Sequence, residues 1–356
     1  MKKIKIIIIS LITLVFCATL LIFFTAQSIK DNTISSSSEN TEGKIINHQS
    51  ATSSPPTILH PMSISSLRAD NYPGGDFVIE KTLANGVNYK QYIVSYLSEG
   101  LKIFGLLTVP TADRPENGFP SILFIHGYID PKIYSTTGNY PSYQARLARA
   151  GFITFKPDLR GHGNSEGEAV GAHFSEKYVI DTLNALAYLK KYHDTDPNRI
   201  AYWGHSNGGE IGLRVAVISS DIKAYSLWAG VVGSYLDMFE SYNNEIGFLR
   251  QASDSDLVKE NALPSQNPSF WNQLDPYSYL SEIDAPIQLQ HATGDESVPI
   301  ILSKRLHEEL EKANKTVEYL EYQGDDHNIG NNSALAFQKT IDFYNKYLNL
   351  EQPTAE

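Results

Sequence analysis

Between residues 121 and 348 the sequence alternates short apolar runs with amphipathic ones, and this alternation constrains the fold more than any other feature. The apolar runs SILFIHG, FITFKPD, RIAYWG, AYSLWAG, PIQLQHATGD and VEYLEY have the length and composition of buried strands. The runs between them, such as SEKYVIDTLNALAYLKKY, place apolar side chains on one helical face. Repeated strand–helix units predict an α/β fold, in which helices cover both faces of a mostly parallel sheet.

Two further patterns extend this architecture. The runs FVIEKTL, YKQYIVSYL and LKIFGLLTVP precede the alternation and predict antiparallel strands at one edge of the sheet. Residues 234–283 interrupt the alternation and are too long for a simple connection, which predicts a short helical insertion. The aromatic residues of this insertion either line a pocket beneath a lid or pack the insertion onto the core, and packing is favoured for each one taken singly: Phe270, Trp271, Tyr277 and Tyr279.

Residues 1–28 have the composition of a targeting segment. Lys2, Lys3 and Lys5 stand at its start, and the 21 residues from Ile6 to Ala26 carry no charge. At 1.5 Å per residue such a helix spans the roughly 30 Å hydrocarbon core of a bilayer. An uncleaved signal anchor and a cleaved signal peptide both fit. Either predicts that the lysines stay inside, that the segment contacts the membrane and that the rest of the chain is exported.

Composition sets the remaining boundaries and excludes one class of partner. Residues 29–75 are dominated by Ser, Thr, Asn and Pro, which predicts a flexible linker before a folded domain at 76–350 and a tail at 351–356. The formal net charge is −11 and no basic patch follows the N-terminus, so nucleic-acid binding is not expected. The single cysteine, Cys17, lies in the apolar segment, so the exported part has neither a disulfide nor a thiol nucleophile.

The hexapeptide GHSNGG at 204–209 is the candidate nucleophile motif. Gly204, Ser206 and Gly208 match G-x-S-x-G, preceded by the strand RIAYW and followed by the helix NGGEIGLRVAV. This strand–turn–helix setting is typical of a nucleophile elbow, which exposes the serine hydroxyl above the sheet. Side chains at Gly204 and Gly208 are expected to clash where the strand and the helix approach each other.

A serine nucleophile needs a base, and the base needs an acid that orients it. Asp295 follows the strand PIQLQHA, and His327 lies in the loop after the strand VEYLEY. Both stand at carboxyl ends of predicted strands, where Ser206 also lies and where open α/β sheets place their sites. The order Ser, Asp, His fits this kind of fold. The histidines beside glycines are interpreted instead as partners of loop backbone: His126, His162 and His205.

An oxyanion hole completes the predicted site. One donor is the backbone N–H of Asn207, and the second is expected from the loop after SILFIHG, with the N–H of Tyr128 as its candidate. Alternatively, the Tyr128 hydroxyl points at substrate. In DLRGHGNSEG, Asp158 and Arg160 are interpreted as braces of neighbouring loops, and Asp326 as a brace of the loop of His327. The pattern predicts neither a metal nor a cofactor.

Together these motifs resemble the catalytic domain of the prolyl oligopeptidase family, in its dipeptidyl-peptidase and acylaminoacyl-peptidase-like branch. The likeness runs over about residues 76–350 and includes ILFIHGY, YWGHSNGGEIGLRVA and YQGDDHNIG. The resemblance implies an α/β-hydrolase fold and a cofactor-independent serine hydrolase with Ser206 as nucleophile, Asp295 as acid and His327 as base. It also implies a small ester or short peptide as substrate.

The sequence predicts the residues of the site more closely than it predicts the bond that they cleave. Peptidases of this family usually carry an N-terminal β-propeller, whereas a predicted linker and a few strands precede the hydrolase core here. Ester and peptide hydrolysis therefore both stay open, as does acyl transfer by the same serine. A non-catalytic binding protein on this scaffold is expected to lack one member of the triad, and none is missing. The sequence does not predict an oligomeric state.

Overall fold

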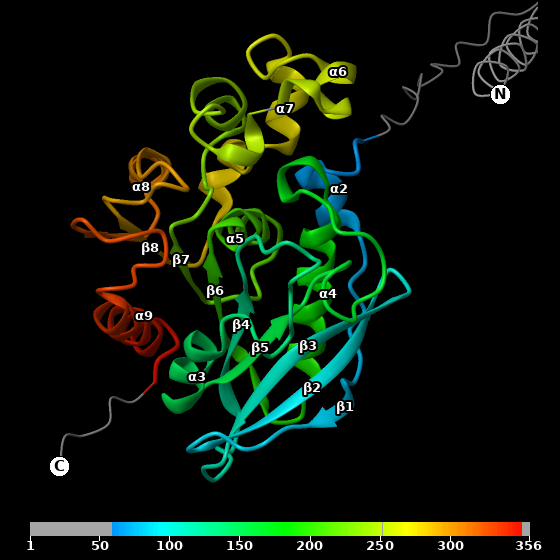
Figure 1. Cartoon of the computed structure of the whole chain (residues 1–356), viewed down its shortest axis with the longest axis vertical. Coiled ribbons are helices and arrows are strands. Elements are labelled where there is room, and N and C mark those ends of the chain that lie inside the picture. Colours follow the sequence, from blue (N-terminus) through cyan, green and yellow to red (C-terminus); the bar gives the residue numbers. More distant parts are fainter. Residues whose placement is uncertain (1–58, 251, 351–356) are drawn as a thin grey trace, which may run out of the picture. The chain divides into compact units, whose positions relative to one another are not determined.

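The computed structural model describes residues 59–250 and 252–350 (Figure 1). The apolar segment at 6–26, most of the predicted linker and the tail at 351–356 lie outside these ranges. Within them, no helix combines the length and the apolar character needed to cross a membrane.

A nine-stranded sheet organises the described part of the chain, in the order β1-β2-β3-β5-β4-β6-β7-β8-β9 (Figure 1). Neighbours from β5 to β9 in this order are parallel, and β1, β2 and β3 join antiparallel at one edge. This confirms the predicted fold class. The strands are β1 (Val78–Thr82), β2 (Tyr89–Ser98), β3 (Leu101–Pro110), β4 (Phe119–Ile125), β5 (Ile153–Pro157), β6 (Thr195–His205), β7 (Ala224–Trp228), β8 (Ile287–Ala292) and β9 (Val317–Tyr322).

Helices cover both faces of the sheet, which explains why the central strands are apolar throughout. In β4, Leu123 and Ile125 belong to the core on one face, and Ile122 and Phe124 to the core on the other. The first core also contains side chains of α4 (Lys177–Lys191), α5 (Asn207–Ile218) and α8 (Ile301–Lys312). The second contains side chains of α3 (Pro141–Arg149) and α9 (Ser333–Tyr347).

The predicted insertion is a set of short helices between β7 and β8 with an apolar cluster of its own. Trp271 is buried in this cluster and donates its indole N–H to the carbonyl of Ala262 at 3.0 Å. The Tyr277 hydroxyl donates to the carbonyl of Val232 at 2.8 Å. The Trp271 ring therefore packs within the insertion, and Tyr277, which packs against the first core, ties the insertion to the segment after β7. The helices are η2 (Asp237–Ser241), η3 (Gly247–Leu249), η4 (Ala252–Asp254), α6 (Asp256–Asn261), α7 (Pro268–Leu274) and η5 (Pro276–Glu282).

The folded part begins earlier than predicted. The predicted linker runs to residue 75, but α2 (Ile64–Ala69) lies inside that range and contacts α5. Ser63 caps α2, because its hydroxyl accepts from the N–H of Ser66 at 3.1 Å. Ile64 and Leu67 are buried against the core. The serine-rich composition hides these apolar residues, whose burial depends on a helix far along the chain.

Two ionisable side chains of α5 are buried on the side of the helix that faces α2. The Arg214 guanidinium donates to the Tyr235 hydroxyl at 2.9 Å and to the carbonyl of Met62 at 2.7 Å. Glu210 lies 3.8 Å from Arg214. Burial raises the pKa of Glu210 to about 8, although the nearby Arg214 opposes the shift. Near neutral pH the Glu210 carboxyl is therefore mainly protonated.

This shift makes a testable link between pH and stability. Between about pH 4.3, the ordinary pKa of glutamate, and about pH 8, the folded protein keeps a proton that the unfolded chain has released. The free energy of unfolding therefore falls as pH rises through this window, by on the order of 1 kcal/mol per pH unit. Glu210→Gln lacks this loss. Urea unfolding at pH 5, 6.5 and 8 should show that the free energy of unfolding of Glu210→Gln increases relative to that of the wild type as the pH rises. The exposed variant Glu116→Gln should show the same pH dependence as the wild type. A constant difference between Glu210→Gln and the wild type contradicts the assignment.

Candidate active site

Ser206 occupies a strained turn between β6 and α5. Its φ of 55° is unusual for a residue with a side chain. Backbone hydrogen bonds hold this conformation: the Ser206 N–H donates to the carbonyl of Trp228 at 2.9 Å. Its carbonyl accepts from the N–H of Gly209 at 2.9 Å and of Val231 at 3.1 Å. The turn has the strand–turn–helix geometry predicted from the sequence.

The two motif glycines let the helix approach the sheet. A Cβ on Gly208 would overlap the carbonyl oxygen of Ile125 at the end of β4. A Cβ on Gly204 would overlap the carbonyl of Gly208. The sequence prediction for both positions is therefore confirmed by the space available.

The loops after β8 and β9 bring Asp295 and His327 together. The Nδ1 of His327 lies 2.7 Å from the Oδ2 of Asp295, whose side chain is fully buried. An ionised carboxylate only accepts hydrogen bonds, so Nδ1 carries the proton and Nε2 is left as the acceptor. Ser206 and His327 line one cavity of about 360 Å³. All three predicted residues thus lie just after the carboxyl ends of their strands, on the same side of the sheet.

His291 is a partner of Asp295 that sequence reasoning missed. Its buried ring lies on β8, where Nε2 donates to the Oδ2 of Asp295 at 3.0 Å and Nδ1 accepts from the Ser303 hydroxyl at 2.7 Å. The Oδ1 of Asp295 accepts from the N–H groups of Ser297 and Val298 at 2.8 and 2.9 Å. The spacing of His291 and Asp295 in HATGD was the available signal.

These contacts keep Asp295 ionised. Burial alone raises the pKa of a carboxyl group. Here the hydrogen bonds from His291 and His327, together with the attraction of His327, outweigh burial and hold the pKa of Asp295 well below its usual range. Asp295 is therefore a negative charge beside the His327 ring at neutral pH.

The predicted oxyanion donors lie near Ser206, because Asn207 follows it directly and Tyr128 lines the same cavity. His126 donates from Nδ1 to the carbonyl of Gly127 at 2.7 Å. Because the C=O and N–H of one trans peptide point in opposite directions, this bond also fixes the direction of the Tyr128 N–H. Asn207 is the first residue of α5, where backbone N–H groups have no partner within the helix. The roles of Asn207 and Tyr128 as donors stay predictions.

A second cavity, of about 410 Å³, lies beside Asn207 and Tyr128. Its wall comes mainly from the segment between β5 and α4, which includes η1 (Ala172–Phe174). Among the described residues that line it, none carries a charge. Besides Asn207 and Tyr128 they are Pro131, Ala169, Val170, Gly171, Ala172, Phe174 and Tyr178.

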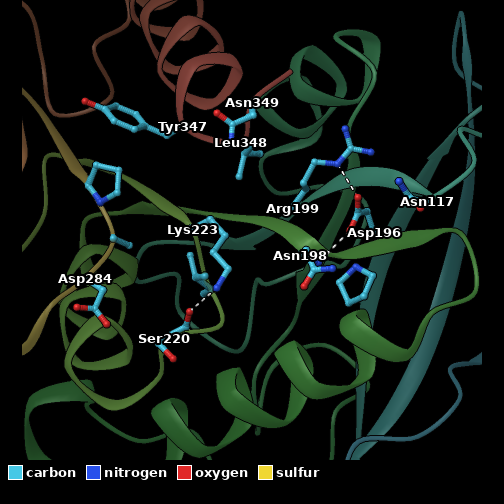
Figure 2. Close-up of a pocket in the computed structure, with 14 residues that line it drawn as sticks. Asn117, Asp196, Asn198, Arg199, Ser220, Lys223, Asp284, Tyr347, Leu348 and Asn349 are labelled. Atoms are coloured by element: carbon cyan, nitrogen blue, oxygen red, sulfur yellow. Dashed lines mark hydrogen bonds and ion pairs between the residues drawn. The ribbon is translucent and has the colours of Figure 1, made fainter. Parts of the chain in front are cut away.

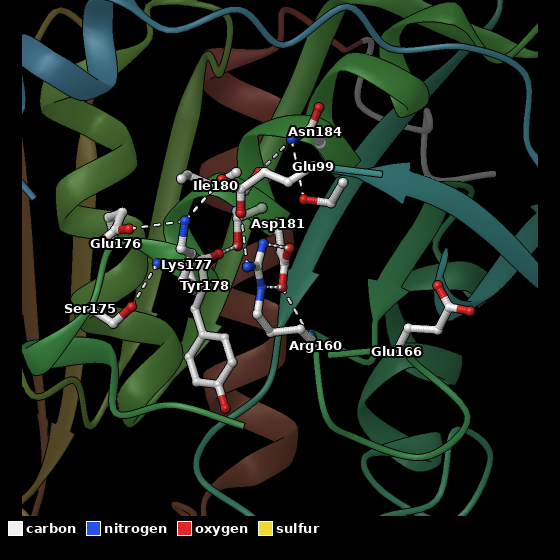
Figure 3. A network of polar contacts seen from close by, with 12 residues as sticks. Glu99, Arg160, Glu166, Ser175, Glu176, Lys177, Tyr178, Ile180, Asp181 and Asn184 are labelled. Carbon is white, nitrogen blue, oxygen red and sulfur yellow. Dashed lines mark hydrogen bonds and ion pairs between the residues drawn. The ribbon is translucent and has the colours of Figure 1, made fainter. Parts of the chain in front are cut away.

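An ion network with a buried Arg160–Asp181 pair at its centre fixes this segment (Figure 3). The Arg160 guanidinium donates to both carboxylate oxygens of Asp181, at 3.0 and 2.6 Å, and pairs with Glu99 at 2.8 Å. Glu99 in turn pairs with Lys177, in the first turn of α4, at 2.9 Å. The network ties the loop after β5 to the β2–β3 turn and to α4, so the structure agrees that Arg160 is a brace.

Asp158 braces the loop that carries Tyr128. It accepts from the hydroxyls of Tyr134 and Thr136 at 2.7 and 2.5 Å. The buried Lys156 ammonium donates to the Tyr134 hydroxyl at 2.9 Å and to the carbonyl of Thr136 at 3.0 Å. Asp326 braces its own loop by accepting from the N–H groups of Asn328 and Gly330 at 3.0 and 2.9 Å.

A wider cavity, of about 1130 Å³, opens at the amino ends of the parallel strands (Figure 2). The start of β6 and the segments before β7 and β8 form much of its wall. Its cationic side chains have protein partners: Arg199 lies 2.6 Å from Asp196, and Lys223 donates to the carbonyl of Ser220 at 2.8 Å. Ser206 and His327 do not line it. Ser206, Asp295 and His327 follow β6, β8 and β9, so the candidate site lies at the carboxyl ends of the strands, as expected for an open α/β sheet.

Comparisons with known proteins agree with the resemblance inferred from the motifs. Residues 139–351, more than half of the chain, match the prolyl oligopeptidase family. A protein of Bacillus subtilis described as the uncharacterized peptidase YtmA is 28% identical over 230 residues, which cover 64% of this chain and 82% of that protein.

Two solved structures show the same fold at low identity. An acetyl xylan esterase from Paenibacillus sp. R4 superposes with a TM-score of 0.63 at 18% identity, over 80% of this chain and 92% of the esterase. An acylaminoacyl peptidase of Pyrococcus horikoshii gives 0.58 at 19% identity, over 79% of this chain and 51% of the peptidase. One is named as an esterase and the other as a peptidase, and their likeness to this chain is one of fold.

Proposed function

The chain belongs to the prolyl oligopeptidase family of serine hydrolases, and from this premise we propose that it cleaves ester or peptide bonds through an acyl-enzyme on Ser206. One observation carries the proposal. The His327 ring is held at 2.7 Å by the buried Asp295 and shares a cavity with Ser206, which stands on a strained turn. A base oriented in this way, in the same cavity as a serine on such a turn, fits the arrangement that activates a serine.

The proposed reaction has two halves. His327 accepts the Ser206 hydroxyl proton at Nε2 while the serine oxygen bonds to the substrate carbonyl carbon. The N–H groups of Asn207 and Tyr128 stabilise the oxyanion that forms. His327 then gives the proton to the leaving alcohol or amine. Water repeats these steps on the acyl-enzyme, which releases the acid and restores Ser206. Asp295 stabilises the imidazolium form of His327 throughout.

The two cavities suggest how a substrate is oriented. Because His327 delivers the proton to the leaving group, that group belongs in the cavity lined by His327. The acyl group then extends past Asn207 into the second cavity, whose described lining is uncharged and largely apolar. We therefore propose a substrate with an uncharged, apolar acyl group.

A substrate panel tests the reaction. p-Nitrophenyl esters of two to eight carbons are compared with aminoacyl-p-nitroanilides, with and without an acceptor alcohol. The expected result is a burst of about one nitrophenolate per chain, followed by turnover. The preferred leaving group then separates esterase from peptidase, and ester formation with the alcohol identifies acyl transfer. Rates equal to the uncatalysed reaction for every substrate contradict the proposal.

If the acyl group occupies the second cavity, beside Asn207 and Tyr128, narrowing that cavity should shift the preference for the acyl chain length of the ester. Val170 is partly exposed on the wall of that cavity, so Val170→Trp narrows it at little cost to the fold. Each buried methylene contributes about 0.8 kcal/mol, so losing room for two carbons lowers kcat/KM for the octanoate ester about tenfold relative to acetate. Ile133→Trp, at an exposed position outside both cavities, is the control. An unchanged octanoate-to-acetate ratio in Val170→Trp contradicts the assignment.

We also propose that the enzyme acts outside the cytoplasmic membrane, in contact with it through residues 6–26. The support is compositional: an uncharged run long enough to span a bilayer follows Lys2, Lys3 and Lys5. Intact cells producing the full chain should hydrolyse an ester that does not cross membranes. Activity that appears only after lysis contradicts the proposal.

A further inference from the structure

Four residues from separate segments form one chain of hydrogen bonds around Ser206. The Gly127 N–H donates to the Tyr140 hydroxyl at 3.1 Å. That hydroxyl lies 2.7 Å from the Nδ1 of His205, and the Nε2 of His205 lies 2.9 Å from the carbonyl oxygen of His327. These hydrogen bonds thus connect the loop of Gly127 to the turn of Ser206, and that turn to the loop of His327.

The direction of each bond follows from its chemistry. The carbonyl of His327 only accepts, so the Nε2 of His205 carries the proton and Nδ1 is the acceptor. Tyr140 therefore donates its hydroxyl proton to His205, and its oxygen is free to accept from Gly127. This arrangement requires a neutral imidazole, and burial lowers the pKa of His205 to about 3. One arrangement of protons satisfies all three bonds.

The backbone around Tyr140 is built to place this hydroxyl. Tyr140 has a φ of 59°, a left-handed conformation that is uncommon for an aromatic residue, directly before Pro141 begins α3. Its ring packs edge-on against Phe124 and Trp203, with centroids 5.8 and 6.2 Å away. A Cβ on Gly127 would lie 2.9 Å from the Tyr140 oxygen and 3.0 Å from the Cβ of Ser206. Glycine at 127 thus permits the contact.

We propose that Tyr140 is a positioning residue for catalysis, which acts with His205 to hold the loop of Gly127, the turn of Ser206 and the loop of His327 at a fixed spacing. The inference rests on the proposed function. The predicted oxyanion donor, the nucleophile and the base come from three different loops. Displacements of about 1 Å at such groups cost up to about a hundredfold in rate, so a link between the loops acts directly on turnover.

Tyr140→Phe tests this role, because it removes the hydroxyl and keeps the ring. We expect kcat for p-nitrophenyl acetate to fall about ten- to a hundredfold, with KM changed less than twofold. Tm should fall by only a few degrees, because Gly127 and His205 each lose one hydrogen-bond partner. The control is Tyr72→Phe, whose hydroxyl donates to the carbonyl of Leu67 at 2.8 Å, outside the cavity of Ser206. It should keep the wild-type kcat. Wild-type kcat in Tyr140→Phe overturns the inference.

A double-mutant cycle with His205→Gln separates a shared chain from independent contacts. If Tyr140 acts through His205, the double variant loses clearly less activity than the product of the two single losses. Losses that multiply overturn the inference. Should Tyr140→Phe fail to fold, His205→Asn and His205→Gln each break one end of the chain, and wild-type kcat in both overturns it.

Labelling of Ser206 by a fluorophosphonate distinguishes this inference from the function on which it rests. Tyr140→Phe is expected to label to completion at Ser206, but more slowly than the wild type. A wild-type protein that does not label contradicts the proposed function itself. Equal labelling rates in Tyr140→Phe and the wild type contradict the positioning role alone.

Discussion

Ser206→Ala is expected to lower kcat for p-nitrophenyl ester hydrolysis by at least about 10⁴-fold, with little change in KM or Tm. Alanine at position 206 removes the hydroxyl that His327 is proposed to activate, so no acyl-enzyme can form there. KM is expected to stay because the proposed substrate contacts are with the walls of the two cavities and not with the hydroxyl. Alanine accepts the turn about as well as serine, so the fold is retained.

The matched control is Ser220→Ala, which changes an exposed serine at the amino ends of the parallel strands. It should keep the wild-type kcat. Initial rates over a range of ester concentrations, with thermal unfolding of each variant, give all three quantities. A Ser206→Ala protein that retains more than about a tenth of the wild-type kcat contradicts the role of Ser206.

Asp295→Asn is expected to lower kcat by about 10⁴-fold through the proton on His327. In the wild type the ionised carboxylate accepts from His327, which leaves Nε2 free to take the Ser206 proton. The Oδ1 of Asp295 accepts two backbone N–H groups, so an asparagine oxygen stays there and its NH₂ group faces His327. That NH₂ group can only donate, so the proton of His327 moves to Nε2 and the base is blocked.

Asp326→Asn provides the comparison for this prediction. Asp326 is next to His327 in sequence, but its carboxylate accepts from loop backbone, and asparagine keeps an accepting oxygen. Its kcat should stay within about threefold of the wild type. Comparable losses in Asp295→Asn and Asp326→Asn contradict the assignment of Asp295 as the orienting acid.

The sequence predicted those parts of the molecule that depend on local chemistry. The alternation of strands and helices gave the sheet because both faces of β4 are buried, which requires an apolar run. The glycines around Ser206 predicted the elbow because the backbones of β4 and α5 leave no room for a Cβ. Asp295 and His327 followed from the ends of predicted strands, where a parallel sheet brings its loops together.

The remaining features depend on contacts between distant segments. Tyr140 was not recognised because its partners, Gly127 and His205, meet only through the sheet. The start of the domain was misplaced because Ile64 and Leu67 become buried against the core formed by later segments. His291 is the exception, because it lies only four residues before Asp295 and contacts it at the turn after β8.

The most direct test of the account is covalent labelling of the full-length protein with a fluorophosphonate, followed by mass spectrometry of the intact chain and of its peptides. If Ser206 is the nucleophile and Asp295 its orienting acid, the wild type gives one adduct per chain, on the peptide that contains Ser206. Ser206→Ala then gives no adduct, and Asp295→Asn is labelled slowly. An unlabelled wild-type protein, or equal labelling of Ser206→Ala, would contradict the role of Ser206 as nucleophile.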